Sequence, residues 1–276
     1  MPLSLARRAI RVPHLGPFLV GIYRAWIALG VAARAIRAAG LWWWRSREIT
    51  NFTYDLMPLN REHLVASLSV VTGEPHARIR GWIAELEEDR ELLDALRLAA
   101  ARGPDSAISD TTPRFGRRLA WYVLVRWRKP RKVVETGVDR GLGAATLTAA
   151  LARNHAEGHP GEYIGIDPNP AAGGLLIPDL ARFGRVLRGS SLDHLTEIDA
   201  IDLFIHDSDH SEAHERAEFE LVESRLSEGA IVVTDNAHVT GALLQFAERT
   251  KRRYLCFSEQ PRFHWHRGAG TGIAFD

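Results

Sequence analysis

The chain has 276 residues, of which 46% are apolar and 25% are charged, so it can build one large domain or two smaller ones around a packed core. Its net charge of +1 gives no strongly basic field and argues against nucleic acid as a partner. Cys256 is the only cysteine, which excludes an internal disulfide and a cysteine-rich metal site and fits a cytoplasmic location.

The first predicted element is an apolar helix over residues 17–44. Arg24, Arg34 and Arg37 interrupt it and leave no run of about 18 uncharged apolar residues, as a membrane span would need. A cleaved signal peptide is not expected, because the apolar core begins too far into the chain. Two interpretations stay open. The favoured one is a helix packed on the rest of the protein or on a second subunit, which predicts a homodimer. The other is a helix on a membrane surface, with arginines at 7, 8, 11 and 24 facing anionic lipid.

Two more helices follow before the pattern changes. Residues 61–71 and 76–101 show helical apolar spacing, with Pro75 opening the second helix and Gly103-Pro104 closing it. Residues 49–57, polar and aromatic, read as a loop. The sequence therefore predicts a helical N-terminal region over residues 1–105.

Residues 106–276 alternate between short apolar runs and helices. The runs predict strands over residues 132–137, 162–167, 184–189, 201–207, 230–235, 254–258 and 271–275, with helices over 144–154, 212–226 and 240–250. This alternation predicts an α/β fold with a parallel sheet covered on both faces. Ligands bind such sheets at the carboxyl ends of the strands, where the polar motifs of this sequence lie.

The first of these motifs is the segment 135–143, between a strand and a helix. Its glycines, Gly137, Gly141 and Gly143, do not have the dinucleotide spacing Gly-x-Gly-x-x-Gly. Glu135 precedes them, and its carboxylate would repel a pyrophosphate but suits a cationic amine or sulfonium, such as the methionine end of a ligand. The alternative is an ordinary strand–helix turn. Asp167 ends the next strand, where an acid can accept hydrogen bonds from both ribose hydroxyls.

Two further motifs end neighbouring strands: residues 206–210 (His-Asp-Ser-Asp-His) and Asp235-Asn236. Because adjacent strands lie about 4.8 Å apart, Asp207, Asp235 and Asn236 can converge on one cation. Their oxygen atoms suit Mg²⁺ or a similar divalent ion, which would lower the pKa of a bound hydroxyl. The alternative is a solvated acidic loop that caps the following helix.

Taken in order, Glu-Thr-Gly-Val-x-Arg-Gly, Ile-Gly-Ile-Asp, Asp-x-Asp-His-Ser and Thr-Asp-Asn resemble the motifs of class I S-adenosylmethionine-dependent methyltransferases. The sequence looks most like the metal-dependent O-methyltransferases that modify sugars in macrolide and aminocoumarin antibiotics. The resemblance covers residues 106–276. It implies a Rossmann-like, seven-stranded methyltransferase fold over that range, with residues 1–105 as a helical cap or lid and the probable dimerisation region.

The resemblance also implies roles for single residues. The methionine end of the cofactor would be lined by Glu135, Thr136, Gly137, Asp139 and Gly141, with Asp167 at the ribose, Ser191 near the adenine and Asp207 beside both cofactor and metal. Asp207, Asp235 and Asn236 would bind Mg²⁺ or another divalent cation. Asp209 would take the proton, with His210 as the second choice. Tyr54, in the segment 51–54, would contact the cofactor from a lid.

Two departures from the family pattern bear on the acceptor. The sugar enzymes often carry Asp-Asp where this chain has Asp235-Asn236, and Asp139 replaces an aromatic residue. His238, His264 and His266 are also within reach of the predicted site, but single histidines of this kind are more often structural.

The expected function is therefore metal-dependent transfer of a methyl group from S-adenosylmethionine to a hydroxyl of a sugar or saccharide-containing small molecule. One competitor is a metal-dependent glycosyltransferase using Asp207-Ser208-Asp209, in which the Glu135 loop would have no role. The other is a non-catalytic, cofactor-binding scaffold. An NAD-dependent dehydrogenase fits less well.

Overall fold

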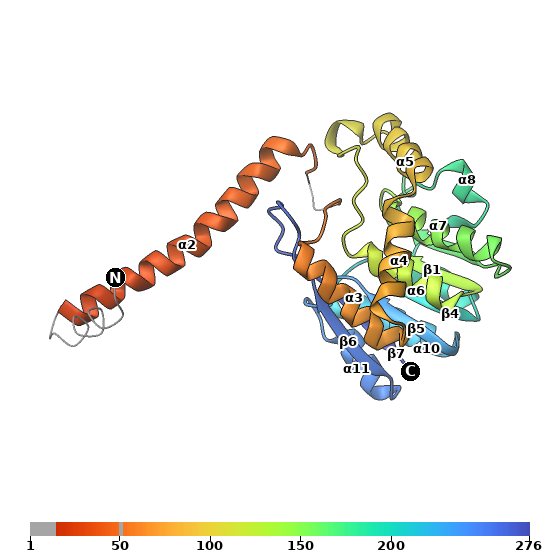
Figure 1. Ribbon diagram of the computed structural model, residues 1–276. Helices are drawn as coiled ribbons and strands as arrows, with labels where there is room; N and C mark the ends of the chain where they lie inside the picture. The colour runs from red at the N-terminus through yellow and green to blue at the C-terminus, as the bar shows by residue number, and fades with distance from the viewer. Residues whose placement is uncertain (1–14, 50–51) are drawn as a thin grey trace. The chain divides into compact units, whose positions relative to one another are not determined.

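The computed structural model describes residues 15–49 and 52–276 (Figure 1). The arginines at positions 7, 8 and 11, and Asn51 of the predicted lid segment, lie outside the described residues. The chain divides into two compact units: one runs to Ser46 and includes Phe263–His266, and the other contains Arg47–Arg262 and Arg267–Asp276. Helices α3 to α5 belong to the second unit.

The first unit is built on α2, which spans Leu15–Arg45. The helix predicted over residues 17–44 is present. Its sequence combines good helix formers such as Ala, Leu and Arg, and Pro17 lies in the first turn, where a missing backbone N–H costs nothing.

The second unit is built on a seven-stranded sheet with the order β3-β2-β1-β4-β5-β7-β6. The strands are β1 (Lys132–Thr136), β2 (Glu162–Asp167), β3 (Gly184–Arg188), β4 (Ile201–His206), β5 (Leu226–Thr234), β6 (Arg253–Ser258) and β7 (Gly270–Phe275). All seven predicted strands are confirmed. The sheet is parallel, as predicted, from β3 to β5, but β7 runs antiparallel to both β5 and β6. The segment between β6 and β7 contains no helix to carry the chain back, as a parallel connection requires.

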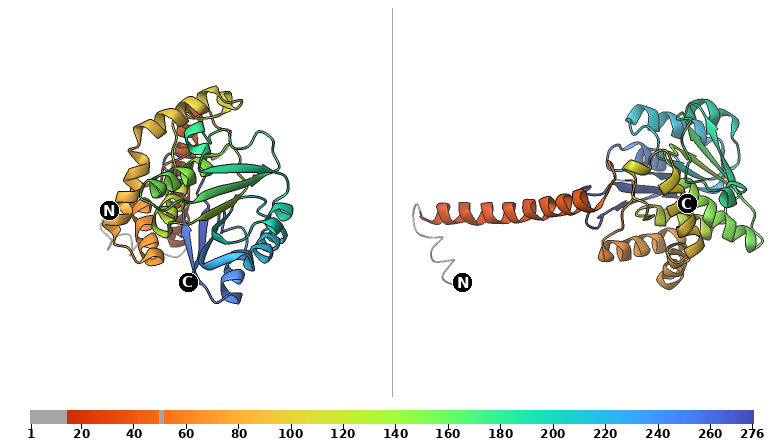
Figure 2. Two further views of the ribbon diagram at one scale, coloured as in Figure 1. Left: turned by 90° about the vertical axis from the view of Figure 1, so that its right-hand side faces the viewer. Right: turned by 90° about the horizontal axis from the view of Figure 1, so that it is seen from above.

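Helices cover both faces of this sheet (Figures 1 and 2). One face carries α6 (Arg118–Arg128) and α7 (Leu142–Ala156), with α3 (Pro58–Thr72), α4 (His76–Glu87) and α5 (Arg90–Arg102) packed around them. The other carries α10 (Glu212–Glu223) and α11 (Ala242–Arg249). Two short helices, α8 (Pro178–Ala181) and α9 (Ser191–His194), lie in the connections.

The single helix predicted over residues 76–101 is wrong. The structure breaks it between Glu87 and Arg90, where the Asp89 carboxylate accepts a hydrogen bond from the Leu92 backbone N–H at 3.0 Å and begins a new helix. Helix α6 was not predicted at all. Its arginines and tryptophans mask an apolar pattern, yet Trp121 to Val125 are fully buried.

Strand alternation divides the buried residues between two cores. Val133, Leu203 and Ile231 pack into the core on the α6–α7 face, whereas Val134 and Phe204 pack into the core on the α10–α11 face. Successive side chains of a strand point to opposite faces, so the sequence position of each residue decides which helices it meets. The same rule assigns the polar residues at the strand ends.

The chain order reverses between neighbouring strands β1 and β4, since β1 leads outward to β2 and β3 on one side and β4 leads to β5 on the other. The crevice at the carboxyl ends of two such strands is the usual ligand site of an open α/β sheet.

Candidate active site

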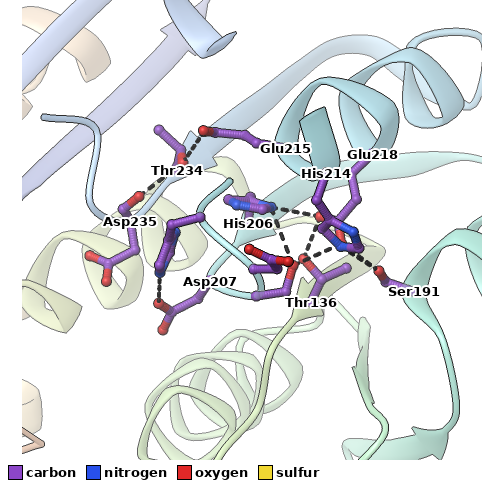
Figure 3. Close-up of polar contacts among 12 residues, drawn as sticks. Thr136, Ser191, His206, Asp207, His214, Glu215, Glu218, Thr234 and Asp235 are labelled. Carbon is purple, nitrogen blue, oxygen red and sulfur yellow. Dashed lines mark hydrogen bonds and ion pairs between the residues drawn. The ribbon is translucent and has the colours of Figure 1, made fainter. Parts of the chain in front are cut away.

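The carboxyl edge of the sheet carries two polar clusters, one on each face. Side chains two residues apart on a strand point to the same face of the sheet. Asp207 and Asp235 therefore lie on the same face as Leu203 and Ile231, which is the face covered by α6. His206 and Thr234 have the opposite parity and meet residues of α10. Figure 3 shows the two groups side by side at the ends of β4 and β5.

The cluster on the α6 face, here called the acid–arginine cluster, consists of Tyr54, Arg117, Asp207, Asp235 and Glu259. Arg117 precedes α6, and its Nε lies 2.5 Å from Asp235 Oδ1 and its Nη2 3.6 Å from Asp207 Oδ2. Its Nη1 donates to the Tyr54 hydroxyl at 3.1 Å, and that hydroxyl donates to Glu259. Four segments distant in the sequence therefore meet at one guanidinium group.

Burial dominates the electrostatics of this cluster. It raises the pKa of Asp207 well above its ordinary value, with the neighbouring Asp235 carboxylate adding to the effect. Burial likewise raises the pKa of Glu259 to about 7, against the lowering effect of Arg117. Arg118 lies beside the cluster, so three carboxyl groups face two guanidinium groups. The cluster is therefore suited to hold a proton or a further cation.

His210 belongs to this site. Its Nε2 lies 3.8 Å from Asp207 Oδ1, and burial lowers the pKa of its imidazole. Ligand atoms of Asp207, His210 and Asp235 all lie within 4.8 Å of one another. The two carboxylates suit Mg²⁺ or Mn²⁺, so Asp207 and Asp235 fit a divalent ion with His210 beside it. Arg117 already pairs with both carboxylates, and a metal ion would compete with it.

The structure places the other two predicted metal and base residues differently. Asn236 follows Asp235 in a left-handed turn with φ of 54° and is half-buried. Asp209 is exposed, and its carboxylate accepts a hydrogen bond from the Ser211 backbone N–H at 2.9 Å, which lowers the pKa of that carboxyl. Asp209 is thus engaged at the start of α10, and of the two predicted bases His210 is the one the fold brings to Asp207.

The cluster on the α10 face is centred on Glu218, which is fully buried. One carboxylate oxygen accepts from Thr136 at 2.7 Å and contacts His206 Nδ1 at 2.7 Å. The other accepts from Ser191 at 2.5 Å and contacts His214 Nε2 at 2.9 Å (Figure 3). Burial alone would raise the pKa of Glu218, but the hydrogen bonds, above all that of His206, lower it to about 2. This cluster fixes the end of β4 from the face of the sheet that α10 covers.

Two residues predicted to touch the cofactor are part of that cluster. The hydroxyls of Thr136 and Ser191 are both committed to Glu218 and buried. Their structural role was not visible in the sequence, because Glu218 lies 82 residues beyond Thr136 on a helix with no recognisable motif.

Glu135 also has a different environment from the one predicted. Its carboxylate is 1% exposed, receives a hydrogen bond from the Tyr163 hydroxyl, and lies beneath the first turn of α7. A Cβ added to Gly143 would come within 2.1 Å of Glu135 Oε1. Strand alternation turns Glu135 toward the α7 core, and its role toward a ligand's ammonium group stays a prediction. Burial raises the pKa of Glu135 to about 7.

Asp167, predicted to hold a ribose, holds the loop after β1. Its carboxylate accepts hydrogen bonds from the backbone N–H groups of Val138 at 2.8 Å, Asp139 at 2.9 Å and Asn169 at 2.8 Å. Gly137 opens this loop with φ of 81°, and a Cβ there would lie 2.1 Å from the carbonyl oxygen of Asp207. The β1 loop and the end of β4 thus touch through backbone at the crevice.

The remaining loop residues lie further along the same turn. Asp139 is exposed and adopts φ of 45°. Gly141 adopts φ of 94°, and the position of its missing side chain faces the backbone of Gly173. The close approach to Gly173 explains the glycine at 141, because a side chain would come within 2.8 Å of that backbone.

A small, partly open pocket adjoins this turn on the side of α5. Arg140 lines it and lies over the Phe52 ring at 4.7 Å. Neither Asp207 nor Asp235 lines this pocket, so the hollow and the acid–arginine cluster lie at separate places along the sheet edge. The other lining residues come mainly from α5 and from the segments 103–113 and 171–175.

Part of this chain is similar in sequence to a known protein family, and its fold is similar to solved structures. Residues 134–237, which run from within β1 to just beyond the end of β5, match the family model described as a methyltransferase domain. A comparison of the sequence with curated proteins finds no match.

Two solved structures of similar fold are an O-methyltransferase from Bacillus cereus in complex with SAH and the cofactor-bound Rv0187 from MTB. The first is 17% identical, with the match covering 72% of this chain and 100% of that chain at a TM-score of 0.50. The second is 20% identical, covering 70% and 92% at a TM-score of 0.50. At these identities the likeness shows the fold. Residues 134–237 are therefore similar to a methyltransferase domain, and the chain has the fold of the Bacillus cereus O-methyltransferase.

Proposed function

We propose that this protein transfers the methyl group of S-adenosylmethionine to a hydroxyl oxygen of a small polyol, with a sugar as the preferred class of acceptor and a divalent cation at Asp207 and Asp235. One observation carries the proposal: Asp207, His210 and Asp235 converge at the ends of β4 and β5, beside the backbone contact between Gly137 and Asp207 at the β1–β4 crevice.

The residues around the crevice supply positioning. Asp167 clamps the amides of the β1 loop, so the loop's shape is fixed before the methyl donor arrives. The Glu218 cluster holds His206 and thereby the adjacent Asp207. Fixing donor and acceptor in line for displacement lowers the barrier, because the entropy of bringing them together is lost on binding and not during the reaction.

His210 is the proposed proton acceptor. Its lowered pKa leaves the imidazole neutral near pH 7, and its Nε2 faces Asp207. A divalent cation bound by Asp207 and Asp235 would hold the acceptor hydroxyl and make it more acidic. The acceptor oxygen then forms a bond to the methyl carbon while the sulfur–carbon bond breaks, and the hydroxyl proton passes to His210.

The preference for a sugar rests on the motif resemblance together with the buried acids, since vicinal hydroxyls are natural partners of a carboxylate-bound cation.

The decisive experiment measures binding and transfer separately. Isothermal titration with S-adenosylhomocysteine is expected to show binding, and titration with a nucleoside diphosphate none. Labelled methyl transfer from S-adenosylmethionine is then followed across a panel of sugars, polyols and catechols, with and without Mg²⁺ or Mn²⁺.

Binding of the nucleoside diphosphate alone would instead favour the glycosyltransferase. Cofactor binding without transfer to any acceptor would favour the non-catalytic scaffold. Transfer to catechols but not to sugars would keep the reaction and overturn the acceptor class. Transfer unaffected by chelators would overturn the role of the metal.

A further inference from the structure

Helix α2 exposes large apolar side chains along its whole length, from Phe18 to Trp44. Among the residues that the structure describes, it is the one helix long and apolar enough to cross a membrane. Large apolar side chains on it are strongly exposed, including Leu29 at 68%, Ile36 at 71% and Trp44 at 80%. An exposed apolar surface of this size marks an interaction site.

The charge of this part of the chain is one-sided. Residues 1–47 contain eight arginines and no aspartate or glutamate. Subtracting these from the total of 35 basic and 34 acidic residues leaves 27 basic and 34 acidic residues in the rest of the chain. The near-neutral protein is therefore a strongly cationic segment joined to an acidic domain, and the natural partner of the segment is an anionic surface.

The arginines of α2 gather on one side of the helix. At 100° per residue, Arg24, Arg34, Arg37 and Arg45 fall within an arc of about 140°. On the opposite side, Phe18, Ile22, Leu29, Ile36 and Trp43 fall within an arc of about 60°. All five of these apolar side chains are exposed. A helix whose charged residues are all basic and lie opposite an exposed apolar face is typical of helices in the membrane interface.

The spacing of the arginines favours lying over spanning. The uncharged runs on either side of Arg24 are residues 12–23 and 25–33, both shorter than the roughly 20 residues that cross a bilayer. A span would place Arg24 or Arg34 within the hydrocarbon, which is costly. A helix in the plane of the interface leaves every arginine at the head groups and buries the opposite side.

Aromatic residues gather at one end of this unit. Trp42, Trp43 and Trp44 end the helix, and the ring of Trp42 lies 5.9 Å from that of Trp265. Phe263 and Trp265 are themselves partly exposed. Tryptophan favours the boundary between head groups and acyl chains. A second copy of the helix fits less well, because pairing two helices that carry arginines and no acids brings like charges together.

We propose that α2 lies in the interface of an anionic lipid membrane, with Leu29 and Ile36 turned into the lipid and Arg34 and Arg37 at the head groups. The interaction attaches the methyltransferase domain to a membrane and is independent of the reaction that the domain catalyses.

The test is flotation of the full-length protein with vesicles of phosphatidylcholine alone or with phosphatidylglycerol added. Two double variants remove two large apolar side chains each: L29Q/I36Q on the apolar side and I27Q/V31Q on the arginine side. Glutamine is a good helix former, so both variants retain the helix. Circular dichroism and thermal unfolding verify that the domain stays folded.

The expected result is binding to the phosphatidylglycerol vesicles and not to phosphatidylcholine alone. L29Q/I36Q is expected to weaken binding at least about tenfold and I27Q/V31Q less than about threefold. R34Q/R37Q is expected to weaken binding about tenfold or more, because each arginine near an anionic surface contributes.

Three results would overturn the proposal. The first is that the wild-type protein floats with neither kind of vesicle. The second is that both apolar variants lose binding equally, as a spanning helix predicts. The third is that L29Q/I36Q dissociates a dimer measured by light scattering without lipid and leaves flotation unchanged, which assigns the apolar face to a second copy.

Discussion

Arg117 is the residue on which the acid–arginine cluster depends, because its guanidinium group bridges Asp235 and Asp207. No sequence motif marks it, since an arginine before an apolar helix is common. A cation that binds between the two carboxylates competes with it, so the residue sets how readily the site takes a metal.

We therefore expect Arg117→Gln to raise the affinity for Mn²⁺ or Mg²⁺ at least about tenfold, since the substitution removes the competing positive charge. Without metal the variant should unfold at a lower temperature, because it leaves buried acids without their partner. Thermal shift in a metal titration measures both effects. Arg216→Gln, an exposed arginine paired with Glu212, is the control. An unchanged metal affinity would mean that the cation, if any, binds elsewhere.

His210 and Asp209 are adjacent in sequence but have different environments. His210 is half-buried against Asp207, whereas Asp209 is exposed and bonded to the Ser211 amide. We expect His210→Gln to lower the rate of methyl transfer by about 10²- to 10⁴-fold, the usual contribution of a general base. Asp209→Asn should change it less than about threefold. The rates of both variants are measured at saturating methyl donor and acceptor. A larger loss of rate in Asp209→Asn than in His210→Gln would assign the base to Asp209.

At the scale of elements, the meeting of the β1 loop with the end of β4 leaves no room for a side chain at Gly137. The residue has φ of 81° and a virtual Cβ 2.1 Å from the Asp207 carbonyl oxygen. Gly137→Ala should therefore abolish binding of S-adenosylhomocysteine and destabilise the fold by about 2 kcal/mol or more.

Gly81→Ala is the matched control, because Gly81 lies on the exposed side of α4 with nothing within 4 Å of its Cβ position. It should leave binding unchanged and raise stability by up to about 1 kcal/mol. Calorimetry measures binding of S-adenosylhomocysteine by the two variants, and urea unfolding measures their stability. Normal binding by Gly137→Ala would show that the β1 loop is not part of the cofactor site.

Helix α10 is tied to the sheet by Glu218, which receives charge-assisted hydrogen bonds from β1, β4 and α9. Glu218→Gln is expected to cost about 2 kcal/mol or more, because the amide replaces an acceptor with a donor among groups that donate. Glu220→Gln, on the exposed side of the same helix, should be neutral. Chemical unfolding of the two variants provides the comparison. Equal stability would mean that the cluster is redundant for folding.

At the scale of the whole molecule, buried acids make stability depend on pH. The pKa values of Glu135 and Glu259 are about 7 in the folded protein, against 4.5 for an ordinary glutamate. A raised folded pKa means that the native state binds more protons between these values. Their contribution to stability is therefore complete below about pH 4.5 and is lost as the pH rises through 7.

We expect Glu135→Gln to become more stable relative to the wild type as the pH rises from 5 to 8, by at most about 3 kcal/mol. Urea unfolding at several pH values measures this difference, with the exposed Glu228→Gln as the control. A difference that does not vary with pH would show that Glu135 keeps an ordinary pKa in the folded protein.

The sequence by itself determined the seven strands, their alternation with helices, the helix over residues 17–44 and the placement of Asp207 and Asp235 at strand ends. These follow from local patterns: apolar runs, glycines at turns and acids after strands. It did not determine the break at Asp89, the buried helix α6 or the antiparallel β7, each of which depends on contacts made by distant parts of the chain.

Only the tertiary structure decided the environment of each polar residue. Parity along a strand is readable from sequence, but which helix covers each face is not. Glu135 therefore lies in the core, Thr136 and Ser191 bond to Glu218, and Asp167 binds backbone amides. Arg117 pairs with Asp207, and Tyr54 bonds to Glu259, which lies 205 residues away in the sequence. Burying several charges together is favourable only where the fold supplies their counter-charges.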